Sequence, residues 1–435
     1  MTAPAETLDA HARLGRAIRS DSLWLFSGYA VTAAIGFVFW IVAALRVAPD
    51  VLGADAALIS VVSAAGAVTS SGIGSSMVVM LPGAGRLRGF LVRRALASTL
   101  VVGAVVGAVA GLLAGRLLNV PGDTVVLVAA ITAMTICWAV FNIEDQMFAG
   151  LGRARWTLFV NGPANLAKLA LTLVLTLPLL AVPHPVLQAT IYPAAAAVLV
   201  SVLVLLPRFL AADEPAEPAI ADVRVLVRAF GVFAVRDSLA IGLLLGAGLL
   251  TPFLVTALAG PVQGALYALA YQFSVALDQI TVGFATSLAK HASTDRAGSV
   301  AMAFRLWRQV FVVVLAGGVL VTVATPVMFG LLGRGYDPVL GAAVVGLLAA
   351  GSVVRSVYSV WSSLLRAERR VVPVLVSNAA CAVLLVALLV ALVPVLGAAG
   401  GALAVLASAG CSALIGTTGL LRLRRDVVPT PGRYA

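Results

Sequence analysis

Three apolar segments of the chain carry polar side chains at helical spacing, each with a charged residue near its middle. In the first segment they recur at i, i+4, i+7 and i+11, which places them on one face of an α-helix. A charge at the centre of a membrane helix costs about 2.5–3.5 kcal/mol on insertion scales, so these faces should meet protein or a water-filled cavity. The three faces comprise Asn161, Asn165, Lys168 and Thr172; Tyr267, Tyr271, Ser274 and Asp278; and Ser352, Arg355, Ser356 and Ser359.

Two interpretations of these faces remain open. The first is a hydrated, cationic cavity that binds an anionic headgroup through Lys168, Arg236 and Arg355, because cations beside low-dielectric walls attract phosphate strongly. The second is structural: Arg355 pairs with Asp278, Lys168 pairs with Asp145, and the serines permit close helix packing.

Four carboxylates are candidates for coupling to H⁺ or Na⁺, since a partly desolvated carboxylate can exchange a proton or an ion as a site opens and closes. They are Asp278, Asp237, Glu144 and Asp145. For the last two, pairing with Arg153 or Arg155 at the membrane boundary is the alternative interpretation. No metal or other cofactor is expected, because the three cysteines lie in apolar runs and the three histidines lack the spacing of a metal site.

The elements that position these residues follow from composition. The chain has 435 residues, of which 61% are hydrophobic and 11% charged, and its mean hydropathy is +1.08. A soluble domain has about 25% charged residues, so this is an all-α polytopic membrane protein. The sequence predicts twelve transmembrane helices, at 22–45, 54–80, 95–118, 124–149, 156–181, 185–206, 229–258, 263–289, 308–332, 339–365, 371–393 and 397–421.

The net charge of +11 reflects topology, and no nucleic-acid partner is implied. With the N-terminus in the cytoplasm, 23 of the 29 Lys and Arg residues fall on the inner side. The outer loops hold Arg46, Arg116 and Arg334, and three more lie within spans. The positive-inside rule therefore predicts that both termini are cytoplasmic.

A polar stretch at 207–228 divides the chain into two halves of six helices. Short matches recur in order in both halves: the sequence DSL at 21–23 and 237–239, and VLGA at 51–54 with VQGA at 262–265. The halves have the same orientation, so we expect two lobes related by an axis along the membrane normal. The predicted parts are a cytoplasmic tail (1–21), an N-lobe (22–206), a cytoplasmic linker (207–228), a C-lobe (229–421) and a second cytoplasmic tail (422–435).

Several motifs resemble those of the polysaccharide flippases, of the O-antigen and exopolysaccharide type, in the multidrug/oligosaccharidyl-lipid/polysaccharide exporter superfamily. They are Gly28 and Gly36 in the first span, RVAPDVLG at 46–53, SGIG at 71–74, LP at 81–82, GLGR at 150–153 and VPVLGAAGGA at 393–402. The resemblance extends over nearly the whole chain. Lipid II is a less suitable substrate, because the first span lacks strong charge and twelve helices are predicted where lipid II flippases usually have fourteen.

The resemblance implies a transporter, not an enzyme, that flips a polyprenyl-diphosphate-linked oligosaccharide outward by alternating access. It further implies a bacterial cytoplasmic membrane, contacts with membrane lipids and polysaccharide-assembly enzymes, and a monomer. Arg355, Lys168 and Arg236 would then meet the diphosphate or acidic sugars. The alternative is an ion-coupled drug or metabolite antiporter of the same superfamily. A membrane glycan polymerase or glycosyltransferase is more remote, because the short outer loops contain no carboxylate pair.

Overall fold

The computed structural model describes residues 35–118, 123–212, 217, 220, 222–292, 296–333, 335–367 and 370–427. The predicted N-terminal tail, the first part of the first span, seven residues of the predicted linker (213–216, 218, 219 and 221) and the last eight residues of the predicted C-terminal tail (428–435) lie outside these residues. A helix Ile35–Arg46 comes first. It is followed by α2 (Pro49–Met80), η1 (Gly85–Leu87), α3 (Arg88–Leu117), α4 (Thr124–Gly150), α5 (Trp156–Leu175), α6 (Pro185–Val200), η2 (Ser201–Leu205), α7 (Leu206–Ala212), α8 (Val223–Asp237), η3 (Ser238–Gly242), α9 (Leu243–Leu249), α10 (Thr251–Ala259), α11 (Pro261–Ala292), α12 (Arg296–Leu332), α13 (Pro338–Ala367) and α14 (Val371–Val427).

The prediction of an all-α membrane protein is confirmed. Within the described residues, nine helical stretches are long and apolar enough to cross a membrane. One of them, α14, bends at Gly397, whose backbone angles (φ 57°, ψ −136°) are not helical. The predicted segments 371–393 and 397–421 are the two arms of this bent element. Glycine is required at the bend because a side chain disfavours positive φ.

Two predicted spans are compound helices. The segment 185–206 corresponds to α6, the π-helical η2 and α7, and the segment 229–258 to α8, the π-helical η3, α9 and α10. Helix also extends into the predicted linker from both sides, because α7 ends at Ala212 and α8 begins at Val223. The region between these helices is therefore 213–222, shorter than the 207–228 predicted from polarity.

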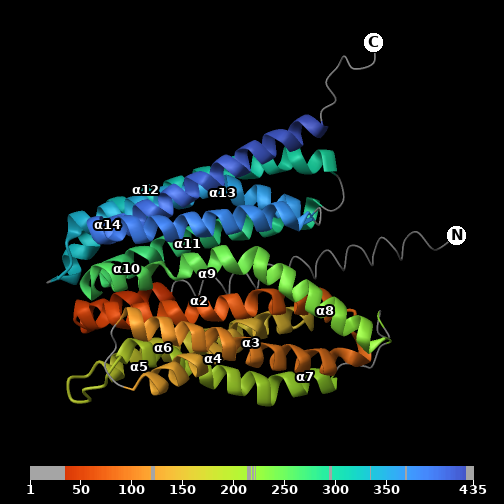
Figure 1. Cartoon of the computed structure of the whole chain (residues 1–435), viewed down its shortest axis with the longest axis horizontal. Helices are drawn as coiled ribbons and strands as arrows, with labels where there is room; N and C mark the ends of the chain where they lie inside the picture. The colour runs from red at the N-terminus through yellow and green to blue at the C-terminus, as the bar shows by residue number, and fades with distance from the viewer. Residues whose placement is uncertain are drawn as a thin grey trace, which may run out of the picture.

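Helices of the first half pack on one another, as do α11 to α14, and α2 contacts both groups. Figure 1 shows α9 and α10 between α2 and the blue helices of the C-terminal half, and α8 running past one end of α2; α2 contacts all three. The contact is close at two points along α2, near its start and about three quarters of the way along it. The carbonyl oxygen of Gly53 accepts a hydrogen bond from Thr256 at 3.4 Å, and the amide of Gly72 donates to Ser238 Oγ at 3.1 Å.

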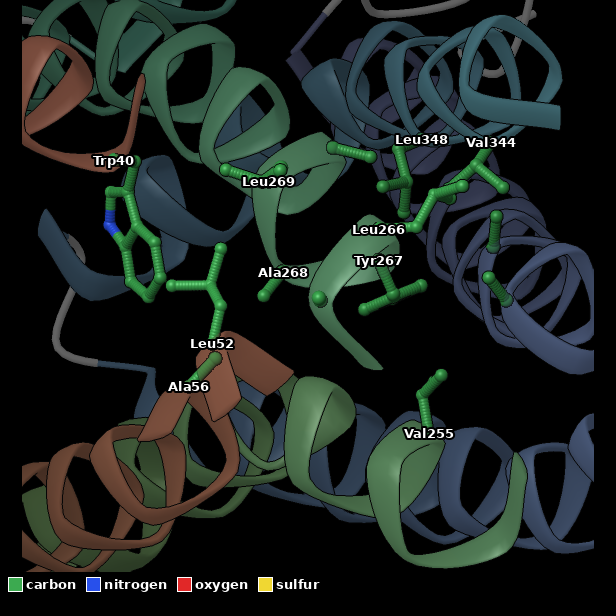
Figure 2. Packing of buried hydrophobic residues seen from close by; sticks show 14 of the residues in the cluster. Trp40, Leu52, Ala56, Val255, Leu266, Tyr267, Ala268, Leu269, Val344 and Leu348 are labelled. Carbon is green, nitrogen blue, oxygen red and sulfur yellow. The ribbon is translucent and has the colours of Figure 1, made fainter. Parts of the chain in front are cut away.

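A cluster of buried apolar side chains fills the space between the two halves in the part of the molecule that α2 and α11 share. Trp40 and Leu52 from the first half pack with Leu269 and Ala268 of α11 in this cluster (Figure 2). Phe37 also meets Phe273 of α11, with ring centroids 4.9 Å apart. In this conformation the contact between the halves is therefore packed with apolar side chains.

Candidate functional site

The charged residues of the second and third polar faces form an ion pair. Nη2 of Arg355 on α13 donates a hydrogen bond to Oδ2 of Asp278 on α11. The helices α11 and α13 pack side by side, and this packing brings Asp278, near the middle of α11, to Arg355, near the middle of α13. Both side chains remain about 30% exposed (29% and 30%), so the pair is partly open. The arrangement matches the structural interpretation, but its exposure leaves the guanidinium within reach of a ligand.

Polar contacts continue from this pair along α11 and α13. Ser274 and Ser352 are buried and share a hydrogen bond between their hydroxyl oxygens at 3.0 Å. Tyr271 stacks on Tyr267 with ring centroids 6.1 Å apart, and Tyr267 is fully buried. Ser356 is also buried and bonds the carbonyl of Val353, whereas Ser359 is half-buried. The hydrogen bond between Ser274 and Ser352 thus joins α11 to α13 one turn from the ion pair, whereas Ser356 bonds within its own helix.

The polar face of α5 surrounds Lys168, whose ammonium meets an aromatic ring. Nζ of Lys168 lies 3.7 Å from the ring centroid of Phe39, in the helix Ile35–Arg46. No carboxylate partner of Lys168 occurs among the described residues. Thr172 and Asn165 bond to the helix backbone one turn before each of them. A cation–π contact is worth about 0.5–2 kcal/mol. Burying a charge costs several kcal/mol, so the Phe39 ring offsets only part of the cost of burying the Lys168 ammonium.

The two carboxylates of α4 have different environments. Both oxygens of Asp145 accept hydrogen bonds from the amide of Asn161, at 3.2 and 3.0 Å. Glu144 is only 1% exposed, and neither of its oxygens has a hydrogen-bond partner among the described residues. The suggested pair between Lys168 and Asp145 is not formed: Asn161, two turns before Lys168 in α5, bonds Asp145, and the ammonium of Lys168 lies over Phe39 instead.

The charges at the end of α8 lie apart from the other candidates. Arg236 is exposed, and Asp237 is half-buried with one oxygen, Oδ2, buried and unpartnered. No hydrogen bond or ion pair described here joins Arg236 to Lys168 or Arg355. The three cations expected to line one cavity therefore have separate environments in this conformation. Lys168 lies over an aromatic ring, Arg355 is paired with Asp278, and Arg236 is exposed.

Four residues that make these contacts were not found from sequence. Phe39 was one apolar residue among many, and only the packing of its helix against α5 reveals its role. Asp55, fully buried in α2, bonds His184 and the start of α6. Tyr358 donates to Asn378 Oδ1 at 2.5 Å, and Asn378 bonds the carbonyl of Ala240 in η3. A charged or amide residue in an apolar run was the available signal for Asp55 and Asn378.

Two hollows are described, and neither contains a predicted cavity residue. One, of about 220 Å³, lies between the end of the first described helix and the segment from α5 to α6, with Arg46, Thr176 and Pro185 in its wall. The other, of about 330 Å³, lies between α5 and α6. Phe39, which contacts Lys168, and Tyr267, which stacks on Tyr271, both belong to the buried apolar cluster between the two halves.

This arrangement defines a polytopic helical membrane protein. No family model matches the chain, and no curated protein matches it. Among solved structures, the chain is similar to an inward-facing multidrug resistance MATE family transporter, with a TM-score of 0.65 at 15% identity over 92% of this chain and 94% of that one. It is also similar to the lipid II flippase MurJ in an inward closed conformation, with a TM-score of 0.66 at 10% identity over 93% and 90%.

A third similar structure is a MOP superfamily transporter from Pyrococcus furiosus Vc1, for which a reversed polarity of the binding pocket suggests a different function. Its TM-score is 0.64 at 14% identity, over 94% of this chain and 95% of that one. Such identities establish the fold alone. The predicted superfamily fold is confirmed, and the polysaccharide-flippase subtype stays a prediction.

Proposed function

We propose that this protein is a transporter that moves a polyprenyl-diphosphate-linked oligosaccharide from the inner to the outer leaflet by alternating access, for cell-surface polysaccharide assembly. The fold supports transport, and the sequence motifs support the substrate. The observation that carries the substrate class is Lys168. It is a membrane-embedded cation with an aromatic contact and, among the described residues, no carboxylate partner.

An unneutralised ammonium in a membrane span is costly, and an anionic ligand would remove part of that cost. The partly exposed Arg355 supplies a second cation from the other half of the chain. Opening of the apolar contact between the halves would bring water, and then the diphosphate, to both cations. Asn165, Tyr271 and Ser359 offer neutral hydrogen-bonding groups suited to sugar hydroxyls.

The test uses proteoliposomes with a lipid-linked oligosaccharide in the leaflet that corresponds to the cytoplasmic side. Lys168→Met should slow glycan appearance in the opposite leaflet by about ten- to hundredfold, the range for losing a charge-assisted contact of about 1.5–3 kcal/mol. Lys168→Arg should retain most of the activity. Arg224→Gln, at an exposed site on α8, is the matched control and should leave the rate unchanged. An unchanged rate in Lys168→Met would contradict the proposal.

The alternative is an ion-coupled drug or metabolite antiporter, and Asp278 is the observation in its favour. Its partly exposed carboxylate could attract a cationic drug if Arg355 moved away. Efflux of a cationic dye against a proton or sodium gradient, abolished by Asp278→Asn but not by Lys168→Met, would favour this alternative. A glycan polymerase or glycosyltransferase would instead form new glycosidic bonds, which product analysis of the same vesicles would detect.

For energy coupling we propose Glu144 and Asp145 ahead of Asp278 and Asp237. A buried carboxylate without a hydrogen-bond partner is stable only when a proton or a cation accompanies it, and Glu144 is in that position. Asp278 is already neutralised by Arg355. Glu144→Gln should abolish the dependence of transport on an H⁺ or Na⁺ gradient, whereas Asp278→Asn should retain it. Gradient dependence that survives in Glu144→Gln would remove Glu144 as the coupling residue.

The proposed setting is a bacterial cytoplasmic membrane, with both termini cytoplasmic, a monomeric chain and contacts to polysaccharide-assembly enzymes. Cysteine accessibility in whole cells tests the orientation. A reporter cysteine at Arg422 should be protected from a membrane-impermeant reagent, and one at Arg46 should react.

A further inference from the structure

An apolar groove lies on the lateral surface of the helix bundle, between α5 and the compound helix of α6 and η2. Its volume is about 330 Å³, and every residue in its wall is apolar. Phe159 and Val200 at its edges are more than half exposed, at 58% and 51%. In a membrane protein, such exposed apolar side chains meet lipid chains, so the groove opens to the bilayer.

The groove has a cause in the sequence. Pro163 lies inside α5 and Pro193 inside α6, and both contribute to the wall. A proline ring removes one backbone hydrogen bond and displaces the preceding turn, so two helices with internal prolines do not pack closely along their length. Four alanines, including Ala167 and Ala196, line the same space, and their small side chains leave it unfilled.

The helix α5 presents different chemistry on two faces. Residues of one face of α5 line the groove: 156, 159, 160, 163, 164 and 167 recur at helical spacing. Asn161, Asn165 and Lys168 lie on another face of the same helix. A single helix thus separates the apolar groove from the residues proposed to bind the diphosphate.

Cations cluster at one end of the groove. Trp156 in the wall packs on Phe209, with ring centroids 5.3 Å apart, and the guanidinium of Arg153 lies 5.5 Å from the Phe209 ring. The neighbouring Arg155 and Arg208 are exposed. This end corresponds to the cytoplasmic side by the positive-inside rule. An apolar groove with arginines at its inner-leaflet end is complementary to a lipid with an anionic head and an apolar chain.

We propose that this groove is the inner-leaflet loading site for the lipid-linked substrate, with the polyprenyl chain between α5 and α6 and the diphosphate at Arg155 and Arg208. The inference rests on the proposed function. A single groove suits a single-chain lipid, whereas a phospholipid would leave its second chain outside. A diphosphate also carries more charge than a phosphodiester, and arginine forks bind phosphate oxygens in pairs.

The test is photolabelling of the full-length protein in vesicles of phosphatidylethanolamine and phosphatidylglycerol. The probe is a polyprenyl diphosphate with a diazirine on its chain, and labelled peptides are mapped by mass spectrometry. The label should concentrate in residues 156–167 and 193–205. Ala167→Phe and Ala196→Phe fill the groove and should each lower this labelling about tenfold, a change that corresponds to about 1.4 kcal/mol of binding free energy.

Matched variants separate the groove from general membrane contact. Ala104→Phe, at an exposed alanine on α3, should leave labelling unchanged. The double variant Arg155→Gln/Arg208→Gln should weaken labelling by the diphosphate but not by an uncharged polyprenol probe. Even labelling of all lipid-facing helices, or equal competition by excess phosphatidylglycerol, would overturn the proposal. Transport is measured in the same vesicles: labelling without flipping contradicts the proposed function alone, and flipping without groove labelling contradicts the loading site alone.

Discussion

The carboxylate of Asp55, fully buried in α2, accepts a hydrogen bond from Nδ1 of His184 at 2.7 Å. Its other oxygen accepts from the amides of Val186 and Leu187, at 2.8 and 3.3 Å. These amides belong to the first turn of α6, whose donors have no partner within the helix. Asp55 therefore caps α6 from another helix and fixes the start of α6 to α2.

His184 makes this contact depend on pH. The hydrogen bond to Asp55 raises the pKa of His184 above its ordinary value of 6.5. Because the folded pKa exceeds the unfolded one, the stabilisation is complete below pH 6.5 and is lost as the pH rises through the folded pKa. The side chain is 40% exposed, so we expect less than about 1 kcal/mol. His184→Gln should make the melting temperature of the purified protein less dependent on pH between pH 6 and 8. An unaltered pH dependence would mean that the His184–Asp55 contact is not its source.

The ion pair of Arg355 and Asp278 is suited to a double-mutant cycle. Either Arg355→Gln or Asp278→Asn leaves one charge without its partner, so each should destabilise the protein more than the double variant does. We expect a coupling energy of about 0.5–3 kcal/mol, measured by thermal or denaturant unfolding in detergent. Transport discriminates the roles: a purely structural arginine predicts that the double variant regains activity, whereas a ligand-binding arginine predicts that it stays inactive.

Gly72 sets the approach of α2 to η3 at one end of the contact between the halves. A Cβ at this position would lie 2.6 Å from the amide nitrogen of Ser238 and would also overlap the carbonyl of Ala234. Gly72→Ala should therefore separate α2 from η3 and lower the melting temperature, at a cost of about 1–3 kcal/mol. Gly410→Ala in α14 is the control, since nothing lies within 4 Å of its Cβ, and it should be neutral or stabilising. Equal melting temperatures would contradict this contact.

Asn378 ties the π-helical η3 to α13 and α14. Its amide bonds the carbonyl of Ala240, and its Oδ1 accepts from Tyr358. Tyr358→Phe removes one buried donor and should cost about 1–3 kcal/mol, because the Asn378 oxygen then lacks that partner. Hydrogen exchange should also accelerate within residues 238–242. The control is Tyr192→Phe, at an exposed tyrosine of α6; a similar loss of stability there would mean that the network is not responsible.

The membrane class, most helix positions and the three polar faces were predictable from sequence, because hydropathy and helical spacing are local properties. The option of an Arg355–Asp278 pair could be stated in advance, since both residues lie at the midpoint of a span. The two π-helices and the helical extension into 207–228 were not predicted. Irregular turns depend on packing between helices, and polar residues also form helix where a span leaves the apolar region.

Partner choice was decided by tertiary structure alone. The sequence suggested that Lys168 pairs with Asp145 or shares a cavity with Arg355. In the fold, Lys168 instead lies over the Phe39 ring, and Asp145 accepts hydrogen bonds from Asn161. The groove beside Pro163 likewise needs a second helix with its own proline. Helical spacing states which residues share a face but not which helix that face meets. Rotation and crossing of the helices determine this, and they follow from side-chain packing across residues distant in sequence.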